Sequence, residues 1–357
     1  MKALPLLLVL LLALACRPQK VVTKRPEIPL DAIAQQTYTY AEVDRRRPLA
    51  VWEAELGLPN YASSLLERNS RQDLLLDLYG PRDAVRRPLV VLVHGGAFLP
   101  GVGGRADTAM RVIAGALAQR GYRVASIDYR GMDLLAPSFL KGAYTATQDN
   151  RAALRYLVNH ADSYHLDRDN IHLLGISAGA ITALNTAFLQ DGEPIGGRAA
   201  KFERMYGCLD CVGEEALQPY RIRSVTSFAG ALFDPAVVSD NPDIATLLVC
   251  GGRDEVIPVD HGLPYPSYTR QFNELIELAQ SYAVNYPLLL QELEEGKMLP
   301  VCGSRRVQSA LQKAGNDCEL VELPDATHDL LFSTTDVLTA QGKELIARTA
   351  AFCYEHS

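Results

Sequence analysis

The sequence predicts an α/β fold: a doubly wound, mostly parallel sheet with helices on both of its faces. Short β-branched segments alternate with segments of helical periodicity through the middle of the chain. Strands that alternate with helices are joined by crossover connections, which make neighbouring strands parallel. The run from Pro88 to Val93 is apolar without interruption, as a strand covered on both faces requires.

The expected strands follow from local patterns taken in chain order. An apolar strand at 74–79 ends at Gly80-Pro81, and the buried strand at 88–93 comes next. Further strands are expected at 122–127, 171–174, 224–228, 246–250 and 318–323.

Three helices complete the pattern. The first covers about 106–120 and is closed by Gly121. The second covers about 146–160, where Ala152, Leu154, Leu157 and Val158 make one apolar face. The third runs from about Val337 to Tyr354.

Length and composition limit the class of protein. The chain has 357 residues, which suits one large domain or two ordinary ones. Apolar residues make up 48% and charged residues 22%, which excludes a collagen, a coiled coil, a disordered protein and a multi-span membrane protein. Lys and Arg number 35 against 42 Asp and Glu, a net charge of −7. Without a basic field to hold a phosphate backbone, we expect no nucleic-acid partner.

The first residues have the pattern of a signal peptide, 1–15. Met1-Lys2 precedes an apolar run from Leu6 to Leu14, which is too short to span a bilayer. Ala13-Leu14-Ala15 is a small-x-small cleavage site, and Cys16 follows it directly. This resembles a bacterial lipobox, although Ala13 stands where Leu is usual. We expect Cys16 to carry a lipid anchor; the alternative is plain secretion with an unmodified Cys16.

The segment after Cys16 predicts where the domain works. Residues 16–35 are polar, contain Pro and lack periodicity, so they read as a tether to a folded domain at 36–357. The protein is therefore expected to be secreted, or periplasmic and held to the outer membrane of a bacterial envelope. The lipid anchor would be its only link to a membrane. Disulfides persist in such an oxidising compartment.

A candidate nucleophile lies in Gly175-Ile176-Ser177-Ala178-Gly179, between a buried strand and a helical segment. On such a turn a serine hydroxyl projects above the edge of the sheet, and glycines allow the close packing around it. The alternative is a Gly-rich turn with an ordinary serine. The strand, turn and helix around the motif favour Ser177 as the nucleophile.

A candidate oxyanion hole follows the strand at 88–93. His94-Gly95-Gly96-Ala97-Phe98 contains small residues that let backbone N–H groups point into a site. We expect the N–H groups of Gly96, Ala97 and Ala178 to stabilise a developing oxyanion. The alternative is a glycine turn without a catalytic role.

A serine nucleophile needs a base and an orienting carboxylate. Asp254 comes just after the strand at 246–250, and His328 just after the strand at 318–323. Both therefore follow strands that end at the same edge of the sheet as the strand before Ser177. Glu255 and Asp260 are rival carboxylates for the orienting role. His94 is expected to be a structural turn residue, and His261 lies in an insertion. The remaining histidines lack a motif: His160, His165, His172 and His356.

These pieces together resemble the α/β-hydrolase superfamily, and within it the secreted carboxylesterases related to hormone-sensitive lipases. The resemblance covers about residues 73–354 and also includes Asp128-Tyr129-Arg130 and Gln148-Asp149. One departure is Ala97, where many relatives have a third Gly. The resemblance implies hydrolysis of small carboxylic esters by Ser177, Asp254 and His328, with no cofactor.

Two insertions are expected around this core. Segment 190–222 should lie at the sheet edge opposite Ser177, and its Cys208-Leu209-Asp210-Cys211 predicts a local disulfide rather than a metal or redox site, since only two ligands are present. Segment 259–300 is longer than a simple connection needs and should rise beside Ser177 as a helical cap. Its apolar helical stripe is Phe272, Leu275, Ile276, Ala279 and Tyr282, with Tyr265, Tyr268 and Tyr286 around it. The alternative is a packed helical hairpin without substrate contact.

The remaining cysteines predict two long-range disulfides. Cys302 is expected to open a helix at the Ser177 edge of the sheet, and Cys318 to begin a strand at the other edge. A helix of about 12 residues would hold them roughly 18 Å apart, too far for a bridge. Cys250 should end beside Cys302, and Cys353 beside Cys318, so we expect Cys250–Cys302 and Cys318–Cys353. The alternative is buried free thiols.

The sequence thus favours a serine carboxylesterase that forms an acyl-enzyme. Its expected partner is a small ester or an acylated polysaccharide. A serine peptidase of prolyl-oligopeptidase type uses the same residue order, but residues before 73 are too few for a propeller domain. A non-catalytic hydrolase-fold binding protein is the other alternative, and a complete set of Ser, Asp and His argues against it.

Overall fold

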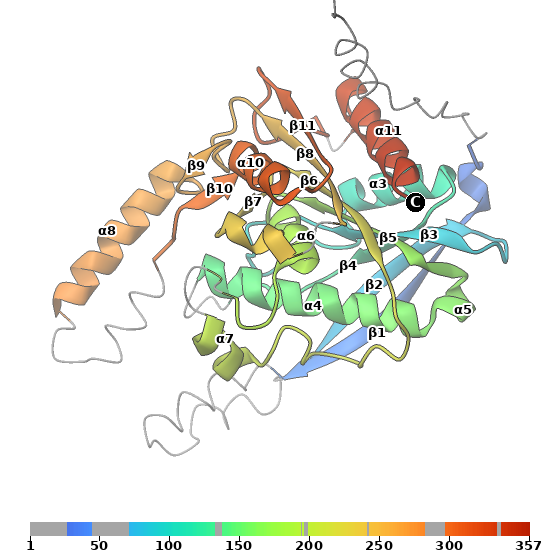
Figure 1. The fold of residues 1–357 in the computed structure, drawn as a ribbon, viewed down its shortest axis with the longest axis horizontal. Coiled ribbons are helices and arrows are strands. Elements are labelled where there is room, and N and C mark those ends of the chain that lie inside the picture. The colour runs from blue at the N-terminus through green and yellow to red at the C-terminus, as the bar shows by residue number, and fades with distance from the viewer. Residues whose placement is uncertain are drawn as a thin grey trace, which may run out of the picture.

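The computed structural model describes residues 27–44, 71–132, 138–193, 195, 199–240, 243–282, 297–333 and 337–357. An eight-stranded sheet runs through the domain in the order β1-β2-β4-β3-β5-β6-β8-β11 (Figure 1). Its strands are β1 (Ile33–Asp44), β2 (Arg71–Pro81), β3 (Arg87–Val93), β4 (Arg123–Ile127), β5 (Leu166–Ile176), β6 (Ile222–Phe228), β8 (Ala245–Gly251) and β11 (Cys318–Leu323). β2 pairs antiparallel with β1 and β4, and every other pair is parallel.

Helices cover both faces of this sheet, as predicted. Residues of α4, α6 and α10 contribute to one apolar core, and residues of α3 and α11 contribute to the other. The helices are α3 (Thr108–Gln119), α4 (Phe139–Asn159), α5 (Ala161–Tyr164), α6 (Ala178–Phe188), α7 (Ala199–Tyr206), α8 (Pro266–Tyr282), α10 (Ser304–Ala314) and α11 (Ala340–Glu355). Two short 3-10 helices are η1 (Leu30–Ala32) and η3 (Pro235–Asp240). The expected doubly wound α/β fold is confirmed.

Some elements differ from the sequence prediction. β1 begins at Ile33, inside the segment 16–35 that was expected to be a tether, and pairs with β2 along the whole of β2. α4 begins at Phe139, earlier than the expected 146, with Ser138 as its N-cap accepting from the N–H of Lys141. Its first turns are buried on every side, so their sequence shows no single apolar face.

A second, three-stranded sheet lies beside the main one. Its strands, β7 (Ala231–Leu232), β10 (Val301–Gly303) and β9 (His261–Gly262), pair antiparallel. Strands of two or three residues are too short to produce a periodic pattern, so the sequence did not predict them. This small sheet joins the start and the end of segment 259–300 to the loop after β6.

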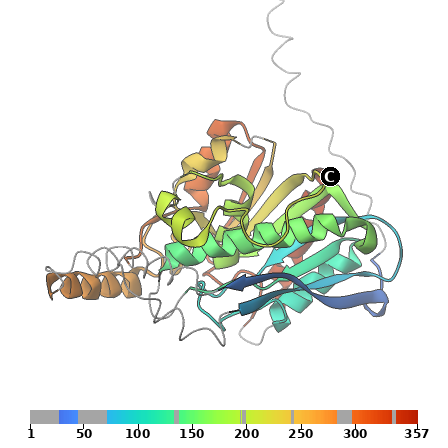
Figure 2. The ribbon, with the colours of Figure 1, turned by 90° about the horizontal axis from the view of Figure 1, so that it is seen from below.

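The expected helix of segment 259–300 is α8. In both views α8 extends away from the body of the domain (Figures 1 and 2). The side chains of its predicted apolar stripe, of Tyr268 and of Tyr286 lie outside what the structure describes. Tyr265, which precedes the helix, is among the described residues.

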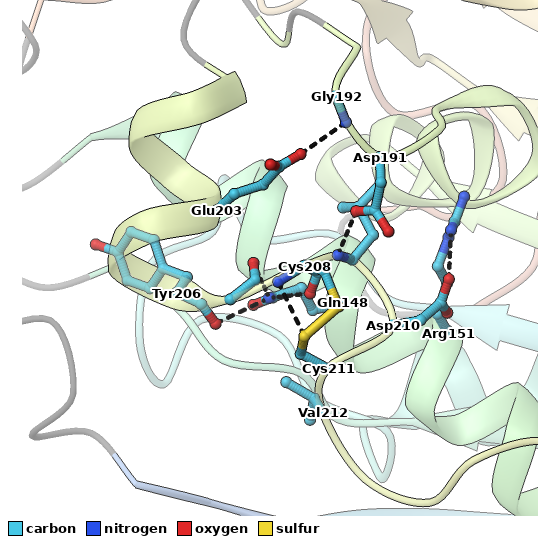
Figure 3. The surroundings of a disulfide bond; sticks show 12 residues. Gln148, Arg151, Asp191, Gly192, Glu203, Tyr206, Cys208, Asp210, Cys211 and Val212 are labelled. Carbon is cyan, nitrogen blue, oxygen red and sulfur yellow. Dashed lines mark hydrogen bonds and ion pairs between the residues drawn. A yellow bond between two sulfur atoms is a disulfide. The ribbon is translucent and has the colours of Figure 1, made fainter.

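The Cys208–Cys211 disulfide is present, with the Cα atoms 5.0 Å apart. Its loop and α7 pack against α4 (Figure 3). The Gln148 amide donates to the carbonyl oxygens of Tyr206, Gly207 and Cys208. Asp210, inside the disulfide loop, forms ion pairs with Arg151 and Arg155. The disulfide thus shapes a loop that holds three buried polar residues of α4.

The two long-range disulfides predicted from the sequence are wrong, because Cys250, Cys302, Cys318 and Cys353 are free thiols. The Cys353 sulfur lies 3.9 Å from Ser224 Oγ on β6. Cys318 is on β11, and β8 separates the two strands. Strands two positions apart are about 9.6 Å from each other, beyond the reach of a disulfide.

Cys302 forms no disulfide with Cys250 for a different reason. Cys302 lies in β10 rather than at the start of a helix, and its sulfur lies 3.9 Å from His261 Nδ1 on β9. Ser304, the first residue of α10, is the side chain near the Cys250 thiol. Burial raises the pKa of the Cys250 thiol to about 11, so it stays protonated at neutral pH.

Candidate active site

Ser177 stands on a sharp turn between β5, which ends at Ile176, and α6, which begins at Ala178. Its backbone has φ 55° and ψ −120°, a conformation that residues other than glycine rarely adopt. The Ser177 N–H donates to the carbonyl of Phe228 (2.8 Å), and its carbonyl accepts from the N–H groups of Ala180 and Ile181. These bonds hold the strained turn, and such strain is typical of functional sites.

The two glycines of the motif are required by close approaches. A Cβ atom on Gly175 would lie 2.1 Å from the Gly179 carbonyl oxygen, and one on Gly179 would lie 2.2 Å from that of Val93. The start of α6 therefore packs directly on the backbone of β5 and β3. This contact keeps Ser177 at the carboxyl end of the parallel strands.

The structure brings the three predicted triad residues together from segments far apart in the chain. His328 Nε2 lies 2.9 Å from Ser177 Oγ, and His328 Nδ1 lies 2.8 Å from Asp254 Oδ2. The Asp254 side chain is 1% exposed and that of His328 is 19% exposed. One side of the imidazole thus faces a hydroxyl, and the other faces a buried carboxylate.

Backbone donors hold the Asp254 carboxylate in place. Its other oxygen, Oδ1, accepts from the N–H groups of Val256 (2.8 Å) and Ile257 (2.9 Å). The rival carboxylates lie elsewhere: Asp260 pairs with Arg306 at 3.3 Å, and Glu255 is exposed. The geometry therefore selects Asp254 as the partner of His328.

The loop predicted to form the oxyanion hole has an unusual backbone. Gly96, Ala97 and Phe98 all have positive φ, and a Cβ atom on Gly96 would lie 2.0 Å from the Val102 carbonyl oxygen. Phe98 is fully buried and packs edge-on against Phe139 of α4. Within the described residues, the N–H groups of Gly96, Ala97 and Ala178 make no hydrogen bond. They are available to a ligand.

Buried polar side chains next to this loop hold it in place. His94 is buried and stacks on the Tyr129 ring, and the Tyr129 hydroxyl donates to the His94 carbonyl (3.0 Å). Desolvation lowers the pKa of His94, which favours a neutral structural residue, as expected from the sequence. The next residue along, Arg130, pairs with the fully buried Asp149 of α4 at 2.7 Å.

A pocket with a volume of about 240 Å³ opens beside the Ser177 hydroxyl. Most of its wall is apolar. The lining residues are Gly95, Gly96, Ile176, Ser177, Phe228, Ala229, Tyr265, His328, Asp329, Leu330, Leu331 and Phe332.

Several wall residues were not predicted as site residues. Phe228 ends β6 at the carboxyl edge of the sheet, a position that could have indicated it. Leu331 and Phe332 follow His328 closely and reach the pocket because the chain folds back there. No residue of segment 190–222 is among the described lining residues, in agreement with its expected distance from Ser177.

The described residues contain no group of three or more His, Cys, Asp or Glu that could hold a metal ion. In the same residues, no helix is both long and apolar enough to cross a membrane.

Part of the chain and its overall fold are similar to known esterases. The BD-FAE family model matches residues 76–212, which include Ser177 and the 94–98 loop but neither Asp254 nor His328. The solved structure of a thermophilic esterase from Thermogutta terrifontis, Est2 with propionate bound, aligns with a TM-score of 0.51 and 19% identity. That alignment covers 80% of this chain and 90% of the esterase, so the likeness extends over most of the fold.

The chain therefore has the α/β-hydrolase fold. Two plant proteins named probable isoprenylcysteine alpha-carbonyl methylesterase ICMEL1 are similar to part of this chain. The protein from Oryza sativa subsp. japonica is 35% identical over 124 residues, 33% of this chain. The protein from Arabidopsis thaliana is 29% identical over 140 residues, 37% of this chain. The chain spans 27% of the length of each of these curated relatives.

Proposed function

We propose that this α/β-hydrolase is a serine carboxylesterase that cleaves small carboxylic esters through an acyl-enzyme. The observation that carries the proposal is the hydrogen-bond chain from Ser177 Oγ through His328 to the buried Asp254 carboxylate. A serine nucleophile, a base and an orienting carboxylate in this geometry are the requirements of acyl transfer. The names of the similar proteins, which are methylesterases and an esterase, support an ester as the substrate.

The first half of the reaction follows from this arrangement. Ser177 Oγ attacks the ester carbonyl carbon while His328 Nε2 takes the hydroxyl proton. The carbonyl oxygen becomes an oxyanion, which the N–H groups of Gly96, Ala97 and Ala178 stabilise. The intermediate collapses, the bond between carbon and the alcohol oxygen breaks, and His328 gives its proton to the leaving alcohol.

The second half returns the enzyme to its starting state. His328 Nε2 takes a proton from a water molecule, whose oxygen attacks the acyl carbon. The new intermediate collapses, the bond to Ser177 Oγ breaks, and the proton returns to Ser177 as the carboxylic acid leaves. Asp254 holds the imidazole in the tautomer with Nδ1 protonated and stabilises the imidazolium in both halves.

The size and character of the pocket favour small, apolar substrates. Its volume of about 240 Å³ lies below the 300–1,000 Å³ of pockets that enclose drug-sized ligands. An acetyl or other short acyl group on a larger alcohol, including a polysaccharide, also meets this limit. We propose small free esters or acylated polysaccharides as substrates, and a chain-length series of p-nitrophenyl esters beside acetylated xylan would distinguish them.

We also propose that the predicted anchor holds this esterase in the cell envelope. Cys16 and the segment before it lie outside the described residues, so the proposal depends on the sequence pattern. A lipid on Cys16 would hold the domain at the membrane surface, and the chain from 17 to 26 would separate it from the first described residues.

Substitution of the nucleophile tests the proposal. Ser177→Ala should lower kcat for p-nitrophenyl acetate by about 10⁴–10⁶-fold, the cost of removing a triad nucleophile. Circular dichroism and the thermal midpoint should be unchanged. Ser309→Ala is the matched control, because Ser309 lies on the exposed side of α10 and bonds only to the carbonyl of Arg305. Near-normal turnover by Ser177→Ala would contradict the assignment.

A further inference from the structure

Tyr265 is the described pocket residue that comes from segment 259–300. Its backbone has a φ of 47°, a conformation that a bulky residue adopts only when its surroundings impose it. It stands between Pro264 and Pro266, and a residue before proline normally prefers an extended backbone. The strain at Tyr265 therefore marks a position that the fold holds against local preference.

Hydrogen bonds fix Tyr265 relative to the triad. Its N–H donates to the carbonyl of Val256 (2.6 Å), and the N–H of Val256 donates to Asp254 Oδ1 (2.8 Å). On the other side, the carbonyl of Tyr265 accepts from the N–H of Thr269 in the first turn of α8. Tyr265 is thus the joint between α8 and the loop that carries the triad carboxylate.

Tyr265 comes from a different part of the chain than the rest of the apolar wall of the pocket. Phe228 and Ala229 follow from β6, and the residues from Leu330 to Phe332 follow His328. Tyr265 belongs to the inserted segment 259–300 and lines the same pocket. Burial raises the pKa of its phenol, and the nearby Asp254 carboxylate adds to this effect, so the ring is an uncharged wall at neutral pH.

We propose that the Tyr265 ring sets the upper size limit of the apolar group that the pocket accepts, and so determines which esters are cleaved. This inference rests on the proposed esterase function. Tyr265 lines the same pocket as Ser177 and His328, and the backbone bonds to Val256 and Thr269 fix the position from which its ring extends. Removing the ring extends the pocket while the triad stays in place.

The test compares kcat/KM for p-nitrophenyl esters from acetate to decanoate, and for acetates of alcohols of increasing length. Tyr265→Gly removes the ring and relieves the strain, because glycine accepts positive φ. Each further methylene group that fits adds about fourfold to kcat/KM. The ratio for octanoate over acetate should therefore rise by roughly tenfold or more, which corresponds to two additional methylene groups. Tyr265→Phe should keep the wild-type profile, and Tyr265→Trp should lower the ratio.

A matched control separates pocket size from backbone relief. His165→Gly removes the side chain of another residue with positive φ (54°), at the end of α5 and away from the pocket, and should leave the profile unchanged. Active sites are counted by labelling with a fluorophosphonate, so that partial misfolding does not alter kcat/KM. If Tyr265→Gly folds poorly, Tyr265→Asn takes its place, since asparagine also tolerates this conformation.

The outcomes distinguish this inference from the proposed function. A wild-type protein that is neither labelled nor able to hydrolyse any of the esters would contradict both proposals. A second outcome would overturn only the role of Tyr265. In it the wild type hydrolyses short esters, and Tyr265→Gly and Tyr265→Trp keep the wild-type dependence of kcat/KM on the length of both the acyl group and the alcohol. The expected change in the dependence of kcat/KM on the length of the acyl group or of the alcohol supports the role of Tyr265.

Discussion

Three residues that line the pocket have positive φ without being glycine: Ser177, Ala229 and Tyr265. Each is held by a hydrogen bond from its own N–H to a carbonyl of another segment: Phe228, Val249 and Val256 respectively. Such conformations cost of order 1–3 kcal/mol each and persist only where the surroundings impose them. At the scale of single residues, these three strained positions lie around the Ser177 hydroxyl.

The carboxylate of the triad gives a residue-scale prediction. Asp254→Asn should lower kcat by about 10⁴-fold, because an amide cannot hold the imidazole tautomer that takes the proton from Ser177. Steady-state kinetics with p-nitrophenyl acetate measures the change. Glu255→Gln, a substitution of the exposed neighbouring carboxylate, should remain within about twofold of wild type. Equal losses in the two variants would show that Asp254 is not the orienting group.

His172 predicts how stability depends on pH. It is fully buried on β5, its Nδ1 lies 2.8 Å from Ser224 Oγ, and burial lowers its pKa to about 3. The electrostatic contributions of His356 and Arg223 also lower the pKa of His172. The folded state keeps His172 neutral, whereas the unfolded state takes up a proton below its ordinary pKa of about 6.5. The contribution of neutral His172 to the free energy of unfolding is therefore complete above about pH 6.5 and is lost as the pH falls toward 3.

The size of this effect is set by linkage. Each pH unit between about 6 and 4 should remove about 1.4 kcal/mol from the free energy of unfolding through His172. Urea denaturation at several pH values measures it for the wild type and for His172→Gln, which does not titrate. The slope of stability against pH should be smaller in the variant. Parallel slopes would mean that His172 is protonated in the folded state as easily as in the unfolded chain.

At the scale of elements, the site depends on how closely α6 approaches β3 and β5. Gly179→Ala would place a methyl group 2.2 Å from the Val93 carbonyl oxygen, so the helix or the strand must move. We expect a loss of at least about 2 kcal/mol in unfolding free energy together with a large loss of kcat, since Ser177 moves with α6. Thermal unfolding and turnover are the two measurements.

A glycine in the middle of α3 provides the control for this prediction. A Cβ atom on Gly115 would meet only the end of the Leu30 side chain, at 3.4 Å. Because Ala is a better helix former than Gly, Gly115→Ala should stabilise the protein by roughly 0.5–1 kcal/mol and leave turnover unchanged. A similar effect of the two substitutions would argue against the close packing at the elbow.

At the scale of the whole molecule, parallel strands collect the functional loops at one edge of the sheet. The loops after β3, β5, β6, β8 and β11 all contribute residues to the pocket or the triad. Helices on the two faces bury the strands and hold their ends in register. Ser177 and His328, which are 151 positions apart, therefore meet within hydrogen-bond distance.

The predicted lipid anchor is also a property of the whole molecule. If Cys16 is lipidated, the protein from its native host should partition into the detergent phase, and Cys16→Ser should release it into the aqueous phase. Ester hydrolysis should be equal in the two forms, because the anchor lies outside the hydrolase domain. Aqueous partitioning of the wild type would indicate plain secretion.

The sequence alone determined the order of most strands and helices, the elbow at Ser177 and the identity of its Asp254 and His328 partners. These depend on short patterns: a buried strand, a turn that only glycine permits, and a polar residue just after a strand end. The topology of parallel strands then required their ends to share one edge. No distance between remote segments was needed for these predictions.

Only the tertiary structure decided the state of the cysteines, the pairing of β1 and the position of Tyr265 in the pocket. A disulfide depends on ångström-scale separations, and one intervening strand was enough to keep Cys318 and Cys353 apart. β1 is an edge strand whose partner, β2, begins 27 residues after β1 ends (71 − 44), so its pairing has no local signal. Tyr265 reaches the pocket through bonds to the Asp254 loop, which exist only when the whole fold has formed.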